Sequence, residues 1–135
     1  ARIFFTVGSL DYLKMGGRIG KVATAATGKL GVKPVIVMKD GDIGLGGIGR
    51  NRNKLKASVL QVAKKYLDEN GKDNFIVSVG YGYDKEEGFQ FMNEVESALD
   101  VKLDSETNVA IGIVSAVHTG PYPIGLGVIR KYETL

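Results

Sequence analysis

The chain of 135 residues contains 44% hydrophobic and 24% charged residues, which is typical of one folded domain and excludes a disordered or collagen-like segment. With no cysteine and a single histidine, it cannot form a disulfide scaffold, and we expect no metal site. The formal net charge is only +3 and no apolar run approaches the ~20 residues of a membrane span, so we expect a cytoplasmic protein without a membrane span.

The N-terminal part of the sequence predicts a strand and two helices separated by glycines. Arg2–Val7 is rich in β-branched and aromatic residues, as strands are. Ser9 is a good N-cap for a short helix over Ser9–Met15, which Gly16 and Gly17 would end. Small, helix-compatible residues over Val22–Leu30 predict a second helix.

A β-hairpin is expected next. Val32–Lys39 predicts a strand, in which Pro34 must lie at a sheet edge or among the first residues because proline cannot donate a hydrogen bond. Asp40 and Gly41 form a tight-turn signal that leads into a second strand over Asp42–Ile48. This second strand is rich in glycine, which indicates that another group approaches its backbone closely.

Two amphipathic helices flank a further strand at Asn74–Val79. Apolar residues recur at helical spacing over Asn51–Asn70. Asp84 and Glu87 have the spacing of a capping box and predict a helix that runs to about Leu99. The apolar residues expected to form its buried stripe are Met92, Val95, Ala98 and Leu99.

The C-terminal part predicts two more strands. Val109–Val117 is apolar nearly throughout and indicates a central strand that is covered on both faces or buried at an interface. Ile124–Lys131 predicts the last strand. Because strands and helices alternate but one connection is a hairpin, we expect residues 1–135 to form a single α/β domain. It would have two layers: a mixed, roughly six-stranded sheet and helices mainly on one face.

Three separate elements favour anions. Arg18 stands among glycines that leave its guanidinium unobstructed, His118 and Thr119 follow the most apolar predicted strand, and Arg50 and Arg52 begin the long helix. Each has a structural alternative: a salt bridge for the first, a structural hydrogen bond for the histidine, and a solvated helix start for the last pair. Beside strongly apolar strands, they would suit an amphiphile with an acidic head and a hydrocarbon tail.

Two other classes of function remain open from the residues alone. Gly44–Gly49 reads G-x-G-x-x-G before a helix and could belong to a dinucleotide-binding enzyme, although no strand ends directly before it. Arg50, Arg52 and Lys54, with two tyrosines as stacking surfaces, could contact nucleic acid or an acidic protein. The tyrosines are Tyr81 and Tyr83. We expect no nucleic-acid partner, because the net charge is small.

Four segments, in this order and spacing, resemble the C-terminal half of the DegV family of bacterial fatty-acid-binding proteins. They are LDYLKMGGRIGK from Leu10, VKPVIVMKDGD from Val32, GRNRNKLK from Gly49 and VHTGPYPIGLG from Val117. The resemblance covers essentially the whole chain, and its first and last motifs are specific in combination. One departure is Tyr122, which stands where the family has glycine.

The resemblance implies a lipid carrier rather than an enzyme, with no catalytic residues and no cofactor. The chain would be the acyl-chain-binding half of a two-domain protein whose N-terminal domain is missing here. A long-chain fatty acid would lie between the two domains, with its tail in an apolar tunnel largely within this half. Its head-group residues would be Arg18, His118 and Thr119, together with serine and threonine from the N-terminal domain. The resemblance also implies a fatty acid kinase as partner, which would make acyl phosphate from the presented acid and contact Arg50 and Arg52.

Overall fold

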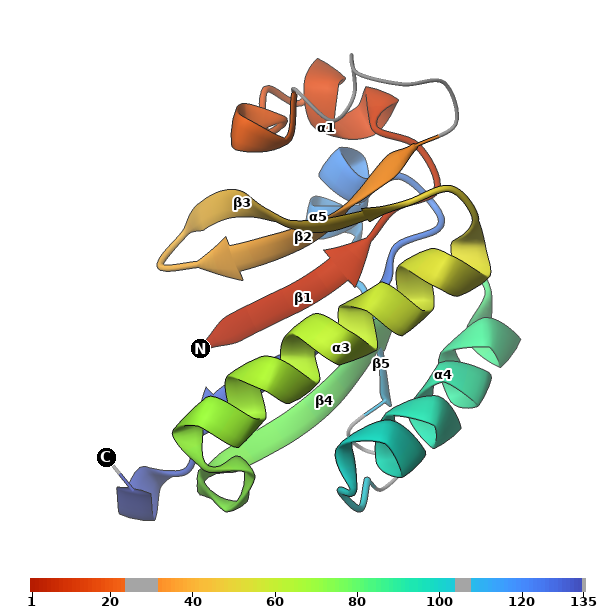
Figure 1. The fold of residues 1–135 in the computed structure, drawn as a ribbon. Helices are drawn as coiled ribbons and strands as arrows, with labels where there is room; N and C mark the ends of the chain where they lie inside the picture. The colour runs from red at the N-terminus through yellow and green to blue at the C-terminus, as the bar shows by residue number, and fades with distance from the viewer. Residues whose placement is uncertain (24–31, 104–107, 135) are drawn as a thin grey trace.

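The structure, a computed structural model, describes residues 1–23, 32–103 and 108–134. Within these residues, six strands form one mixed sheet in the order β3-β2-β1-β6-β4-β5, and the two long helices α3 and α4 cover one of its faces (Figure 1). The strands are β1 (Arg2–Thr6), β2 (Lys33–Lys39), β3 (Asp42–Gly49), β4 (Phe75–Tyr81), β5 (Asn108–Ala110) and β6 (Ile124–Arg130). This arrangement confirms the expected fold class.

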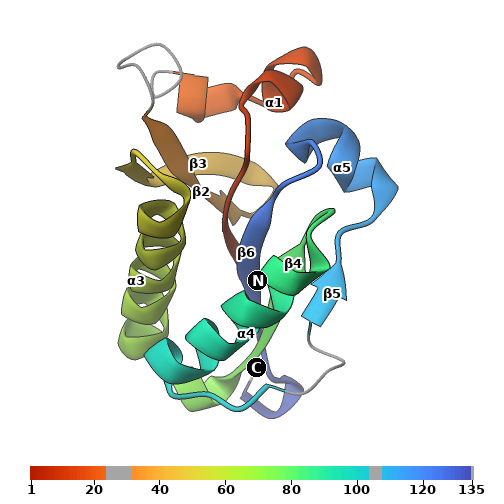
Figure 2. The same ribbon diagram turned by 90° about the vertical axis from the view of Figure 1, so that its right-hand side faces the viewer.

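Helices of two kinds accompany the sheet. The long helices are α3 (Arg52–Asn70) and α4 (Lys85–Leu99), and the short ones are α1 (Asp11–Met15) and α5 (Ile113–Thr119). Figure 2 shows α1 and α5 side by side at one end of the sheet, away from the layer that α3 and α4 form. Single 3₁₀ turns occur at Gly20–Val22, Lys72–Asn74 and Tyr132–Thr134. None of the helices in the described ranges combines the length and apolar character needed to cross a membrane.

The predicted hairpin is confirmed and has the expected turn. β2 pairs antiparallel with β3, and Asp40 and Gly41 both have positive φ, 51° and 81°, as the favoured two-residue hairpin turn requires. β2 lies inside the sheet, yet its pairing with β1 begins only at Ile36. Pro34 therefore lies before that ladder, and its carbonyl accepts a 3.0 Å hydrogen bond from the buried Thr6 hydroxyl.

The main core lies between the sheet and the long helices. From the sheet it takes the large side chains that alternate along each strand, among them Phe4, Val77 and Leu126. From α3 it takes residues at helical spacing, as predicted, and from α4 it takes Phe91, Val95 and Leu99. Within the predicted α4 stripe, Met92 is only partly buried and Ala98 is exposed. The buried α3 side chains of this core are Leu55, Val59, Ala63 and Leu67.

Local capping signals give both long helices their starts. The Asn51 side chain accepts a 2.9 Å bond from the Lys54 amide, and the Asp84 side chain accepts a 3.0 Å bond from the Glu87 amide. These bonds satisfy amide groups that a helix N-terminus leaves without a partner. Helix α1 begins at Asp11, two residues later than predicted, and the Ser9 hydroxyl accepts a 3.2 Å hydrogen bond from the Asp11 amide at this start.

The prediction of a central strand over Val109–Val117 is wrong. β5 is a three-residue strand at the sheet edge, parallel to β4, and Gly112 then starts helix α5. An unbroken apolar run does not distinguish a buried strand from a helix, and here the side chains of Val114 and Val117 are 80% and 62% exposed. The helix predicted over Val22–Leu30 lies mostly outside the described residues.

An exposed ion pair connects the segments that follow the C-terminal ends of α3 and α4. The Lys72 ammonium donates to the Asp100 carbonyl and carboxylate at 2.9 and 2.8 Å, linking the start of β4 to the end of α4. The hydrogen bond raises the pKa of Lys72 and lowers the pKa of Asp100.

Two phenylalanines of α4 provide a matched test of the core. Phe91 is fully buried and Phe89, on the same helix, is 40% exposed. We expect Phe91→Ala to lower the free energy of unfolding by about 4 kcal/mol, since it removes a large side chain and leaves a cavity. Phe89→Ala should cost less than about 1 kcal/mol. Urea denaturation followed by circular dichroism measures both, and equal losses would contradict this description of the core.

Candidate functional site

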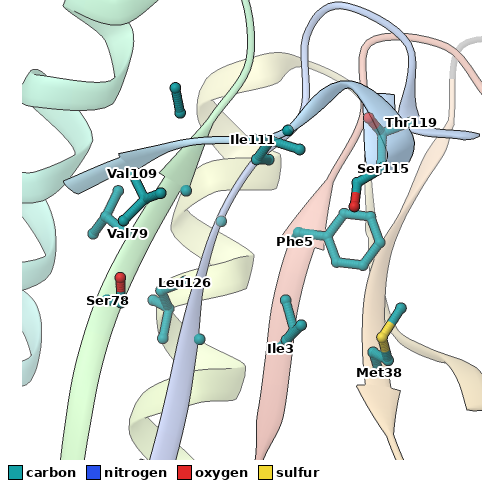
Figure 3. A pocket seen from close by; sticks show the side chains of 15 residues that line it. Ile3, Phe5, Met38, Ser78, Val79, Val109, Ile111, Ser115, Thr119 and Leu126 are labelled. Carbon is teal, nitrogen blue, oxygen red and sulfur yellow. The ribbon is translucent and has the colours of Figure 1, made fainter. Parts of the chain in front are cut away.

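A pocket lies on the sheet face that α3 and α4 leave uncovered, which we call the open face. Its volume is about 360 Å³, within the range of small-molecule sites. Figure 3 shows Ile3, Phe5 and Met38 along one side and Val109 and Ile111 along the other. Most side chains on its walls are therefore apolar, and α5 closes one end.

Glycines of the central strands make the floor of this pocket. Gly125 of β6 pairs with Phe5 on one side and Gly80 on the other, and Gly127 pairs with Ile3 and Ser78. Directly paired residues share a sheet face, so the floor has no side chain at the three glycine positions. At Gly125 a Cβ would collide with the Phe4 carbonyl and the Phe5 Cβ, which shows how closely β1 and β6 approach.

Polar groups gather where α5 meets the pocket. Ser115 and Thr119 line it, and Figure 3 shows their hydroxyl oxygens beyond the Phe5 ring. The Thr119 hydroxyl donates to the Gly120 carbonyl at 3.1 Å and keeps its lone pairs for another donor. Ser78 adds a hydroxyl on the floor. The pocket thus has one polar end at α5 and an apolar body.

The glycine-rich motif that contains Arg18 and the motif that contains His118 lie about a hundred residues apart in the sequence and meet at Gly16. A Cβ on Gly16 would collide with His118 Nδ1, an atom that is buried and has no hydrogen-bond partner among the described residues. The exposed Arg18 reaches the same glycine, because its Nη1 donates to the Gly16 carbonyl at 3.0 Å. The structure therefore brings Arg18 and His118 together at Gly16, and Thr119 follows His118 directly in the sequence.

Arg50 and Arg52 lie elsewhere, at the start of α3 in the helical layer. Arg52 makes a two-pronged ion pair with Glu87 of α4, with N–O distances of 3.0 and 2.6 Å, and the ammonium of Lys56 lies 3.8 Å from the same carboxylate. Arg52 thereby holds the N-termini of α3 and α4 together. Arg50 is exposed, and of the two arginines it is the more accessible to a partner.

The geometry does not suit the dinucleotide alternative. Gly44–Gly49 lies inside β3, which pairs with β2 along this stretch, and not in a strand-to-helix turn. Its amide groups are therefore not grouped at a helix N-terminus, where a pyrophosphate would bind. The proposed stacking surface is also incomplete, because Tyr81 is buried against Gly88 and only Tyr83 is exposed.

Tyr122, the residue that departs from the family pattern, packs against Gly8 and Tyr83. Its Cβ would lie 3.1 Å from a Cβ on Gly8, and its ring packs edge-on against Tyr83 with centroids 6.2 Å apart.

The described residues contain no group of three or more acidic, histidine or cysteine side chains that could hold a metal ion.

Sequence analysis missed the floor of the pocket. Gly80, Gly125 and Gly127 were not singled out, nor was Ser115. The available signal was the alternation in β6, where glycine and large apolar residues take turns over Ile124–Val128. A period of two places all the glycines of this strand on one face.

The fold and pocket define a two-layer α/β domain with a mostly apolar pocket on its open sheet face. The family model described as "Uncharacterised protein, DegV family" matches residues 1–131, and the chain belongs to the DegV family. A DegV domain-containing protein of Deinococcus radiodurans is 30% identical over 129 residues, covering 93% of this chain and 43% of that protein.

Two solved structures extend the comparison. A stearic-acid-binding protein from Eubacterium ventriosum is 96% identical, with a TM-score of 0.94, covering 99% of this chain and 46% of that chain. A fatty-acid-binding DegV family protein from Thermus thermophilus is 27% identical, with a TM-score of 0.77, covering 96% and 45%. The present chain therefore spans less than half the length of these relatives.

The contact between Gly16 and His118 can be tested by adding one methyl group. Gly16 has a φ of −80°, so alanine fits the backbone, but its Cβ would displace the imidazole. We expect Gly16→Ala to cost about 1 to 3 kcal/mol of stability through overpacking and to shift the imidazole resonances of His118. Gly112→Ala is the control, since a Cβ there meets nothing within 4 Å. Unchanged imidazole resonances in Gly16→Ala would contradict the contact.

Proposed function

We propose that this chain is the acyl-chain-binding half of a fatty acid carrier that acts in the bacterial cytoplasm. The proposal rests mainly on the apolar pocket on the open face, with its glycine floor and polar end. The near identity to a protein solved as a stearic-acid-binding protein supports the choice of ligand. By this proposal the chain binds and presents its ligand and performs no chemistry itself.

The pocket suits a hydrocarbon tail. Each methylene group moved from water to an apolar surface contributes about 0.8 kcal/mol to the binding free energy. Because Gly125 and Gly127 of β6 and Gly80 of β4 have no side chain, the tail has room to lie against the backbone. A chain laid on Gly125 and Gly127 would contact Ile3 and Phe5 on one side. The N-terminal domain that the family resemblance implies would cover the tail from the other side.

The acidic head belongs at the polar end. A carboxylate near an apolar pocket must be hydrogen-bonded or paired, because burying it without a partner costs several kcal/mol. Thr119 lines the pocket, and its hydroxyl, which donates to the Gly120 carbonyl in this structure, would turn to donate to the carboxylate instead. His118 and Arg18 stand at the adjoining contact between α1 and α5. We assign head-group binding to these three residues, together with serine and threonine from the N-terminal domain.

We further propose, from the family resemblance, that a fatty acid kinase receives the presented acid. The kinase would transfer a phosphoryl group to the carboxylate and form acyl phosphate. Of the two arginines expected to contact it, Arg50 has an accessible side chain, whereas Arg52 is engaged by Glu87. Arg50 would therefore make the direct contact, and Arg52 would fix the end of α3 that carries it.

Filling the pocket floor tests ligand binding. A Cβ on Gly127 meets only the Arg2 carbonyl and Ile3 Cγ1, at 3.8 and 3.9 Å, so valine is tolerated while its methyl groups occupy the tail position. We expect Gly127→Val, in the full-length protein, to lower retained fatty acid about tenfold or more, since filling a pocket excludes its ligand. Native mass spectrometry and solvent extraction measure the retained acid.

The control is Gly44→Val, a sheet glycine whose Cβ meets only the Val37 carbonyl at 3.8 Å. Gly44 pairs with Val37, which shares the helical face with Phe4, so this variant should keep its ligand. Wild-type protein that neither retains nor takes up fatty acid would refute the carrier function. Normal retention by a folded Gly127→Val would refute this pocket as the site.

Charge reversal tests the kinase contact. We expect Arg50→Glu to slow acyl phosphate formation about tenfold at low ionic strength, because an opposed charge at the rim of an interface slows association. The bound fatty acid should be unchanged. Lys65→Glu, an exposed reversal further along α3, should leave the rate unaltered, and equal rates for both variants would exclude the contact.

A further inference from the structure

The glycine floor of the pocket ends at two isoleucines. Alternate residues of β6 face the same side of the sheet, so the open face carries Gly125, then Gly127, then Ile129. Ile129 pairs directly with Ile76 of β4, and paired side chains on one face are in contact range. After two positions without a side chain, two branched side chains thus stand together across neighbouring strands.

The pocket stops where these isoleucines begin. Gly127 and its partner Ser78 line it, whereas Ile129 and Ile76, the next pair along the same strands, do not. At its other end are the hydroxyls of Ser115 and Thr119. The pocket therefore has a direction: two hydroxyls lie at the α5 end, and at the other end Ser78 is followed by the apolar isoleucine pair.

We infer that Ile129, with Ile76 beside it, forms an end wall that sets the length of the acyl chain this protein retains. The inference rests on the proposed function and adds a specificity-determining residue to it. With the head group at α5, the methyl end of the ligand runs along β6 toward Ile129. The wall lies four residues beyond Gly125, about 13 Å along the strand. A long acyl chain that starts at α5 reaches the wall, and methylenes beyond that point must rise off the sheet.

The side walls of the pocket cannot have the same effect. Ile3 lies beside Gly127 in the register, and Met38 lies beyond Ile3 on β2, so both border the path along its length. Methionine also adapts its shape to what it contacts. Changes at these positions would alter the width available to the tail, whereas a change at Ile129 alters where the path ends.

The experiment offers the full-length protein an equimolar mixture of straight-chain saturated fatty acids of increasing length. Retained acids are extracted and quantified by mass spectrometry. We expect Ile129→Ala to shift the distribution toward longer acids, with each additional buried methylene favouring the longer acid about fourfold. Ile129→Trp should shift it toward shorter acids. Ile76→Ala is a second variant, expected to shift it in the direction of Ile129→Ala.

The matched control is Ile48→Ala. Ile48 is 59% exposed and Ile129 is 55% exposed, but Ile48 lies on the outer strand β3 and does not line the pocket, so its distribution should be unchanged. Normal retention with an unchanged distribution in all three pocket-end variants overturns the end wall and leaves fatty acid binding intact. Absence of any retained acid in the unsubstituted protein overturns the proposed function and the end wall together.

Discussion

The whole domain depends on the two unlike faces of β6. Toward α3 and α4 this strand presents Ile124, Leu126 and Val128, all buried, and they anchor the helical layer. Toward the open face it presents glycine twice. Because Gly125 leaves no room for a Cβ against β1, close strand packing and an empty floor arise from the same residue. One strand therefore stabilises the fold on one side and forms the floor of the pocket on the other.

A second constraint links the polar end to a distant part of the chain. Helix α5 carries His118 and Thr119, and its position depends on the fit of the imidazole against Gly16 and of Tyr12 against Gly120. These contacts make the glycines of both motifs packing residues as well as turn residues. His118 and Thr119 are thus positioned by the contact between α1 and α5, whereas the floor of the pocket is positioned by the sheet.

Much of the fold follows from local signals. The hairpin turn at Asp40 and Gly41, the N-caps Asn51 and Asp84 and the apolar spacing of α3 each act within a few residues, so the sequence suffices to predict them. The prediction of one strand over Val109–Val117 was wrong because an apolar run without a period fits a strand and a helix equally well. The strand gives way to helix α5 at Gly112, which is the N-cap of α5.

The site was harder to predict because it depends on register. Arg18, His118 and Thr119 were singled out from motif composition, but the meeting of Arg18 and His118 at Gly16 is a tertiary contact that spacing does not reveal. The glycine floor needs the pairing of β6 with β1 and β4. The engagement of Arg52 by Glu87 joins residues 35 positions apart, and the same Glu87 was assigned from the sequence only to helix capping.

The irregularity in β3 bears on how copies of this protein behave in solution. Leu45 pairs with Ile36 and Gly47 with Val35, so Gly46 is an extra residue that bulges out of the ladder. β3 is the outermost strand, and its unpaired backbone groups could template another chain. A bulge twists and interrupts such a strand, and glycines have no side chain to pack against a strand of another copy. The bulge and the glycines therefore oppose strand pairing at the outer edge of the sheet, in a domain whose open face exposes several isoleucines.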